Sequence, residues 1–218
     1  GELRTAIENF AKSHYKSVVP INFALQKQFR SIFDDGFDVD KIIRNISLIN
    51  PDLEFIPNDT LIFFDELQAC ANCATSLKAF KLDGRYDVIY SGSLMGINYH
   101  EIESNSVGFK EDYEMHPMDF EEFLWAKGYK PEQIEEMYQS MLSATPLSNV
   151  LLDVMFDNFR EYLVLGGMPA IVRTFIENKN FSGILKMQRQ ILLDYEEDIT
   201  KYAEGLDKGK VLNVYRKI

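Results

Sequence analysis

Two adjacent carboxylates, Asp65 and Glu66, follow four large apolar residues, Leu61-Ile62-Phe63-Phe64. The apolar run is too short for an ordinary helix and predicts a strand that is buried on both faces in a parallel sheet. Ligands of open α/β sheets bind beyond the carboxyl ends of the strands, so acids at that point indicate a site. In a phosphate-processing enzyme the first acid would hold Mg²⁺, usually through water, and the second would polarise the attacking water. The alternative is a strand that runs into a solvated acidic turn.

A second polar group follows the next predicted strand. Residues 87–90, Asp-Val-Ile-Tyr, read as a strand, and Ser91-Gly92-Ser93 comes directly after it. If this strand is a parallel neighbour of the first, Ser91 and Ser93 lie at the same edge as Asp65 and Glu66. The alternative is that one of these serines caps the following helix.

Cys70 and Cys73 form a lone C-x-x-C pair after the acids. A zinc site would need two further ligands from His14, His100 and His116, and these are scattered without metal-site spacing. A redox role would need a thioredoxin-like unit around the pair, and none is evident. We therefore expect two small, partly buried side chains at the start of a helix.

The composition is that of a globular protein. The chain has 218 residues, of which 46% are hydrophobic and 26% charged, enough for one sizeable core and a smaller second one. The net charge of −11 argues against a broad surface for nucleic acid, although a small basic patch remains compatible with it. No apolar run approaches the roughly 20 residues that span a bilayer, and the N-terminus lacks a signal-peptide pattern. We expect a soluble, cytoplasmic protein.

Strand and helix patterns alternate in the first 130 residues. Helical patterns cover residues 5–14, 25–33, 39–49, 74–82 and 119–127, and strand patterns cover 18–23, 61–64, 87–90 and 108–115. Asp38 and Asp119 are the expected N-caps of two of the helices. This alternation predicts an α/β fold with a parallel sheet covered by helices.

The pattern changes at Pro131. Segments 131–142, 147–165, 169–177, 181–202 and 208–218 all have 3.6-residue periodicity, and no strand pattern competes with it. Gly166-Gly167 followed by Pro169 predicts a helix stop and restart. We therefore predict an α/β core over residues 1–130 and an all-helical unit over 131–218.

Several ordered motifs resemble one prokaryotic family of AAA+ ATPases, and the similarity covers nearly the whole chain. They are Leu61-Ile62-Phe63-Phe64-Asp65-Glu66-Leu67-Gln68, Thr75-Ser76-Leu77-Lys78, Asp87-Val88-Ile89-Tyr90-Ser91-Gly92-Ser93-Leu94-Met95-Gly96, His116-Pro117-Met118-Asp119-Phe120-Glu121-Glu122-Phe123-Leu124 and Tyr162-Leu163-Val164-Leu165-Gly166-Gly167-Met168-Pro169. Motifs in a consistent order are more specific than any one of them alone.

The resemblance implies an ATP-binding, Mg²⁺-dependent ATPase domain with a helical lid, acting as a switch or remodelling module. In that family Asp65 would be the Mg²⁺-associated acid of the Walker B element and Glu66 the general base. Ser91 and Ser93 would fall in the sensor 1 segment, where a polar side chain contacts the γ-phosphate or the attacking water. A further C-terminal domain normally follows the lid.

The sequence departs from this family at the phosphate loop. No segment matches G-x-x-x-x-G-K-[ST], whose backbone N–H groups and lysine hold the phosphates. The family places that loop, and the central strand before it, just ahead of residues 5–14. Gly1-Glu2-Leu3-Arg4 could be a remnant of that region. Alternatively, the chain starts after the loop, or disordered residues are omitted from it.

A nucleotide is the first partner to expect, because the leading hypothesis requires one. A protein partner or self-association is also compatible with that hypothesis. An arginine finger is not evident, since only Lys110 lies between Ser93 and Tyr113, and Arg85 and Arg160 are candidates by elimination alone. The alternative hypothesis is a catalytically inactive AAA+-like scaffold that binds a protein partner.

Overall fold

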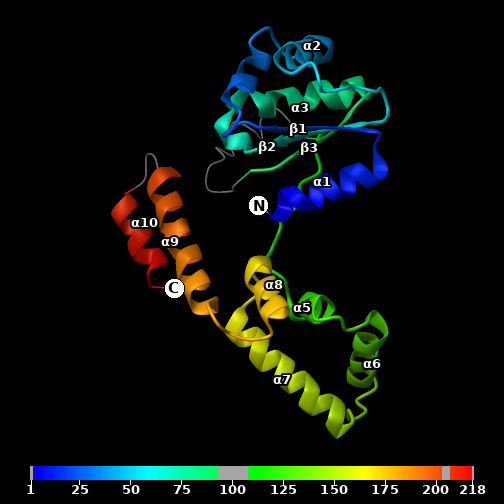
Figure 1. The fold of residues 1–218 in the computed structure, drawn as a ribbon, viewed down its shortest axis with the longest axis vertical. Coiled ribbons are helices and arrows are strands. Elements are labelled where there is room, and N and C mark those ends of the chain that lie inside the picture. The colour runs from blue at the N-terminus through cyan, green and yellow to red at the C-terminus, as the bar shows by residue number, and fades with distance from the viewer. Residues whose placement is uncertain (1, 93–107, 203–206, 218) are drawn as a thin grey trace. The chain divides into compact units, whose positions relative to one another are not determined.

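A three-stranded parallel sheet is the centre of the first half of the chain (Figure 1). Its strands are β1 (Ser17–Asn22), β2 (Thr60–Asp65) and β3 (Asp87–Tyr90), in the order β1-β2-β3. The computed structural model describes residues 2–92, 108–202 and 207–217. The strand expected from the apolar run is confirmed: β2 is the central strand, and its first five residues are buried.

Side chains of the strands alternate between the two faces of this sheet. Ile62 and Phe64 pack in a core with the helices α2 (Val39–Ile49) and α3 (Ala71–Asp83). The helix α1 (Glu2–His14) lies on the other face, so the sheet is covered on both sides (Figure 1). The central position expected for the strand before a phosphate loop is not free in this sheet, because β2 pairs directly with both β1 and β3. Such a strand would have room only beside β1 or β3.

The ends of the two covering helices follow from local sequence. Asp38 accepts a hydrogen bond from the backbone N–H of Lys41 and so caps α2, as predicted. Gly84 ends α3 in the left-handed conformation, with φ of 72°, which glycine adopts without a steric penalty. Both helix predictions are confirmed.

Two other predictions for this region need correction. The segment predicted as a helix over residues 25–33 is a 3-10 helix, η1 (Lys27–Phe33). The strand predicted over 108–115 is absent, and this segment has no regular secondary structure. Its Tyr113 and Met115 side chains are exposed, and Lys110 pairs with Asp112 within the segment, so no buried face drives it into the sheet.

The described residues of the second half are helical. The helices are α5 (Phe120–Ala126), α6 (Pro131–Leu142), α7 (Asn149–Leu165), α8 (Pro169–Asn178), α9 (Ile184–Tyr202) and α10 (Lys208–Tyr215). Phe123, Leu165 and Val172 form part of one core, and Leu124, Ile134 and Met155 form a smaller one.

By packing, the chain divides between Tyr113 and Glu114. The first unit is Gly1–Tyr113 with Tyr202–Asp207, and the second is Glu114–Lys201 with Lys208–Ile218. Helix α5 therefore belongs with α7 and α8, against which it packs. The functional domain ranges expected from the sequence, 1–130 and 131–218, remain predictions. Within the described ranges, no helix combines the length and apolar character needed to cross a membrane.

Candidate functional site

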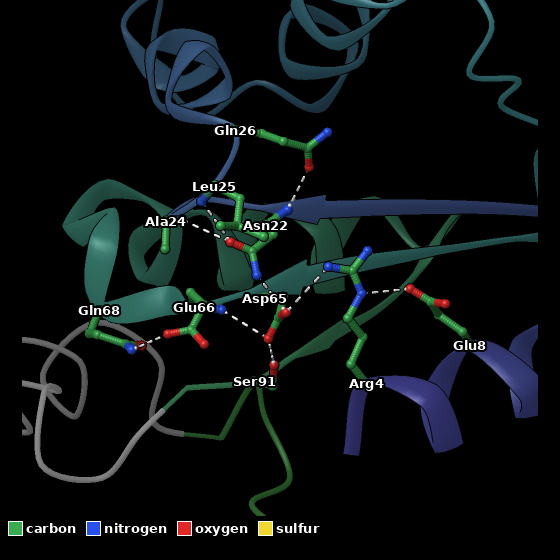
Figure 2. A network of polar contacts seen from close by, with 10 residues as sticks. All are labelled: Arg4, Glu8, Asn22, Ala24, Leu25, Gln26, Asp65, Glu66, Gln68 and Ser91. Carbon is green, nitrogen blue, oxygen red and sulfur yellow. Dashed lines mark hydrogen bonds and ion pairs between the residues drawn. The ribbon is translucent and has the colours of Figure 1, made fainter. Parts of the chain in front are cut away.

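Three polar side chains meet at the carboxyl ends of the three strands (Figure 2). Asn22 pairs with Asp65 in the β1–β2 register, and Ser91 directly follows Tyr90, the partner of Phe64. The Ser91 hydroxyl donates to Asp65 Oδ1 at 2.5 Å, and Asn22 Nδ2 donates to Asp65 Oδ2 at 2.7 Å. The expected juxtaposition of Asp65 and Ser91 is therefore present, and parallel pairing is its cause.

Asn22 is a site residue that was not predicted from the sequence. Its Oδ1 accepts hydrogen bonds from the backbone N–H groups of Ala24, at 3.0 Å, and Leu25, at 2.9 Å. These two bonds fix the orientation of the carboxamide, so that its N–H group is directed at Asp65. The available signal was a polar Asn next to the end of the strand predicted over residues 18–23.

Glu66 has an unusual backbone conformation for a residue with a Cβ atom. Its φ is 60° and its ψ is 51°, in the left-handed region. Its backbone N–H donates to Asp65 Oδ1 at 3.1 Å, and its carboxylate accepts from Gln68 Nε2 at 2.5 Å. Figure 2 shows the Glu66 side chain directed toward Gln68 and away from the Asp65 carboxylate.

A cation from α1 also reaches this edge. Arg4 Nη1 lies 4.0 Å from Asp65 Oδ2, while Arg4 Nε donates to Glu8 Oε1 at 2.7 Å. Arg4 was expected to precede the first helix, whereas α1 begins at Glu2. The guanidinium therefore adds positive charge beside the carboxylate (Figure 2).

The donor set suits magnesium held mainly through water and phosphate. Asp65 accepts three hydrogen bonds, from Ser91, Asn22 and the Glu66 backbone, out of the roughly four that a carboxylate can accept. One acceptor position is left for a metal-bound water, on Oδ2, and Arg4 Nη1 lies 4.0 Å from that oxygen. The described residues contain no group of three or more His, Cys, Asp or Glu side chains that could hold a metal by themselves. Mg²⁺ bound by one carboxylate, water and a nucleotide phosphate fits this set.

The remaining predicted residues are one serine and two arginines. Ser93 lies outside the described residues. Arg85 pairs with Asp83 and Asp40, and Arg160 pairs with Asp157, so both candidate finger residues are engaged within the chain.

The cysteine pair is part of the core. Cys70 and Cys73 are both buried and reduced, at and just after the start of α3. Burial raises the pKa of the Cys70 thiol, and that of Cys73 still more. The prediction of small side chains at a helix start is confirmed, with more complete burial than expected.

The two downstream motifs contact each other. The Met118 N–H donates to the Gly167 carbonyl at 2.7 Å, and the Tyr162 hydroxyl donates to the Met118 carbonyl at 2.9 Å. A Cβ atom added to Gly167 would lie 2.0 Å from the Met118 carbonyl oxygen. These motifs therefore stabilise the helical unit by bringing two backbone segments together.

Comparisons with known proteins agree with the motifs. The model of the AAA domain family matches residues 5–124, and a domain of unknown function, DUF8612, matches residues 156–218. An uncharacterised protein of Methanocaldococcus jannaschii, MJ1544, is 23% identical over 202 residues. That alignment covers 92% of this chain but only 38% of the relative. No solved structure gives a significant match. Because its family model covers more than half of the chain and includes Asp65, Glu66 and Ser91, the chain belongs to the AAA domain family.

Proposed function

We propose that this chain is the nucleotide-binding core and helical lid of an Mg²⁺-dependent ATPase that acts as a switch or remodelling module. The observation that carries the proposal is the cluster of Asn22, Asp65 and Ser91 at one sheet edge, with Glu66 beside it. Membership of the AAA domain family supports nucleotide as the ligand. The proposed division is a core over residues 1–130 and a lid over 131–218.

Each residue has a role that its surroundings permit. Asp65, positioned by hydrogen bonds from Asn22 and Ser91, would hold Mg²⁺ through water. Glu66 accepts a proton from the attacking water once its carboxylate has left Gln68. Ser91, and by resemblance Ser93, supply hydroxyl groups to the phosphate side of the site. Magnesium-bound ATP would supply the phosphoryl group and the charge neutralisation that its transfer requires.

The first test is metal-dependent nucleotide binding by the full-length protein. Mg-ATP at about 100 times its Kd should stabilise the protein by roughly 2.7 kcal/mol, seen as a rise in Tm. In the wild type, EDTA should remove the Mg²⁺-dependent part of this rise in Tm. Asp65→Asn should lack that part even without EDTA. Asp52→Asn, at an exposed acid in the turn after α2, is the matched control and should keep this metal-dependent part of the shift.

The outcomes separate the hypotheses. An equal Mg²⁺-dependent shift in the wild type and in Asp65→Asn would contradict the role of Asp65. A wild-type protein that shows no shift with Mg-ATP would favour the inactive scaffold, which binds partners without nucleotide.

A further inference from the structure

An apolar cavity of about 300 Å³ opens beside α5 and α6, within the second unit. Residues from these two helices line it: Phe120, Glu121, Leu124, Ile134, Met137, Tyr138 and Met141. Leu124 and Ile134 are buried and form its floor, while Tyr138 and Met141 are 52% and 67% exposed. The apolar side chains of Tyr138 and Met141 therefore extend beyond the small core and face solvent.

The chemistry of this lining suits another protein segment. Two aromatic rings, two methionines and two aliphatic side chains surround a single carboxylate, that of Glu121. Methionine is flexible and polarisable, so it adapts to apolar side chains of different shape. Grooves of this kind bind the apolar face of an amphipathic helix, whose anchors recur at positions i, i+3, i+4 and i+7.

The charge around the cavity determines which helix fits. Every charged side chain within α5 and α6 is a carboxylate; the acids are Glu121, Glu122, Glu132, Glu135 and Glu136. Two lysines flank the helices, Lys127 after α5 and Lys130 before α6, and Lys127 pairs with Glu161. A basic partner would be attracted to this surface and an acidic one repelled. Nucleic acid and anionic lipid are disfavoured by the same charges.

We propose that this α5–α6 groove binds a basic amphipathic helix of a partner protein, with two or three large apolar side chains in the cavity and Lys or Arg beside the carboxylates. A second copy of the chain fits less well. In a symmetric contact the acidic α6 helices would face each other, and like charges would oppose the association. The proposal does not rest on ATP binding, since none of the lining residues belongs to the cluster around Asp65.

The test measures binding of a designed peptide by fluorescence anisotropy, using the full-length protein without nucleotide. The peptide is a labelled helix of roughly 18 residues, long enough to form, with Leu at helical spacing, Lys elsewhere and no Trp. A second peptide has Glu in place of Lys. The wild-type protein should bind the Lys peptide, and its affinity for the Glu peptide should be lower by at least about tenfold, or roughly 1.4 kcal/mol.

Two neighbouring substitutions isolate the groove from general charge attraction. Met141→Lys adds a charge inside the cavity lining, whereas Leu142→Lys adds the same charge at the next residue of α6, which is exposed and outside the lining. Met141→Lys should weaken binding of the Lys peptide by about tenfold or more, and Leu142→Lys by less than about threefold. Far-ultraviolet circular dichroism, compared with that of the wild type, verifies that each variant is folded.

Three results would overturn the proposal. The first is equal loss in the two variants, which would mean attraction to the acidic surface as a whole. The second is equal binding of the Lys and Glu peptides. The third is a wild-type dimer in sedimentation that Met141→Lys dissociates, which would make a second copy the occupant.

Discussion

At residue 66 the backbone adopts a conformation that costs free energy. A non-glycine residue in the left-handed region is strained by roughly 1 to 2 kcal/mol, because its Cβ atom approaches the next carbonyl oxygen. Glu66 has this conformation between Asp65, which accepts its N–H, and Gln68, which holds its carboxylate. Such strain is concentrated at functional sites. The strain at Glu66 is consistent with a residue whose carboxylate has a functional role and does not stabilise the fold.

Replacing Glu66 with glycine should preserve or raise stability while it abolishes ATP turnover. Glu66→Gly should leave the free energy of unfolding unchanged or raise it by up to about 1 kcal/mol in urea titrations, because glycine removes the strain. ATP turnover by the full-length protein should fall to background. Lys179→Gly is the control, since Lys179 ends α8 with φ of 53° and lies outside the proposed site. Lys179→Gly should have a similar effect on stability and no effect on turnover. A fall of several kcal/mol in the free energy of unfolding of Glu66→Gly would contradict the presence of strain at this residue.

Asn22 offers a second test at the same scale. Asn22→Asp keeps the shape of the side chain but replaces the N–H donor, 2.7 Å from Asp65 Oδ2, with a second carboxylate. Two carboxylates this close raise one another's pKa. Stability should therefore fall by roughly 1 to 3 kcal/mol at pH 7 and by less near pH 4, where one of the pair is protonated.

Magnesium should reverse this loss in Asn22→Asp, because the new pair of carboxylates binds a divalent cation. Thermal unfolding at both pH values, with Mg²⁺ and with EDTA, measures both effects. A loss that is the same at pH 4 and pH 7 would mean that Asn22 acts through its turn and not through Asp65.

Among the elements, the junction before α5 and the turn between α7 and α8 depend on a close backbone approach. Gly167→Ala should lower the free energy of unfolding by roughly 1 to 3 kcal/mol, because its Cβ atom would overlap the Met118 carbonyl oxygen at 2.0 Å. Gly128→Ala is the comparison: its φ is 92° and no atom lies within 4 Å of the added Cβ, so only backbone strain applies. Urea titration followed by Trp125 emission measures both variants. A smaller effect at Gly167 than at Gly128 would contradict the steric argument.

The elements also show which features the sequence can predict. The strand β2 was predictable because four consecutive apolar residues need burial on both faces. The start of α2 at Asp38 and the end of α3 at Gly84 were predictable because both residues have clear capping chemistry. Asn22 was not predictable as a site residue, because an Asn at the end of a strand equally suits the following turn, and here its side chain contacts both Asp65 and that turn. Residues 108–115 misled because the segment is polar and its Tyr113 and Met115 side chains are exposed, so it has no buried face to hold it against the sheet.

For the whole molecule, the native thiols report on opening of the first unit. Cys73 is fully buried and Cys70 nearly so, and burial raises the pKa of both thiols. Labelling by a thiol reagent should therefore require opening of the structure. Its rate should rise with pH through about 8.5, the ordinary thiol value, because reaction occurs in the opened state.

A core substitution tests whether labelling of the thiols requires opening of the structure. Ile46→Val, in the core around α2, should speed labelling by about two- to tenfold, in line with a loss of roughly 0.5 to 1.5 kcal/mol. Leu48→Val on the exposed face of the same helix should change the rate little. Labelling as fast as that of a free thiol, in either the wild type or the Leu48 variant, would contradict the buried position of the pair.

The proposed role of Glu66 as general base makes phosphate release from Mg-ATP by the full-length protein depend on its carboxylate. Glu66→Gln should reduce the steady-state rate by at least about a hundredfold, the lower range for loss of a general base, while nucleotide binding is retained. Glu54→Gln, an exposed acid beyond the opposite end of β2, is the matched control and should keep the wild-type rate. Equal rates in the wild type, Glu66→Gln and Glu54→Gln would contradict a catalytic role of Glu66.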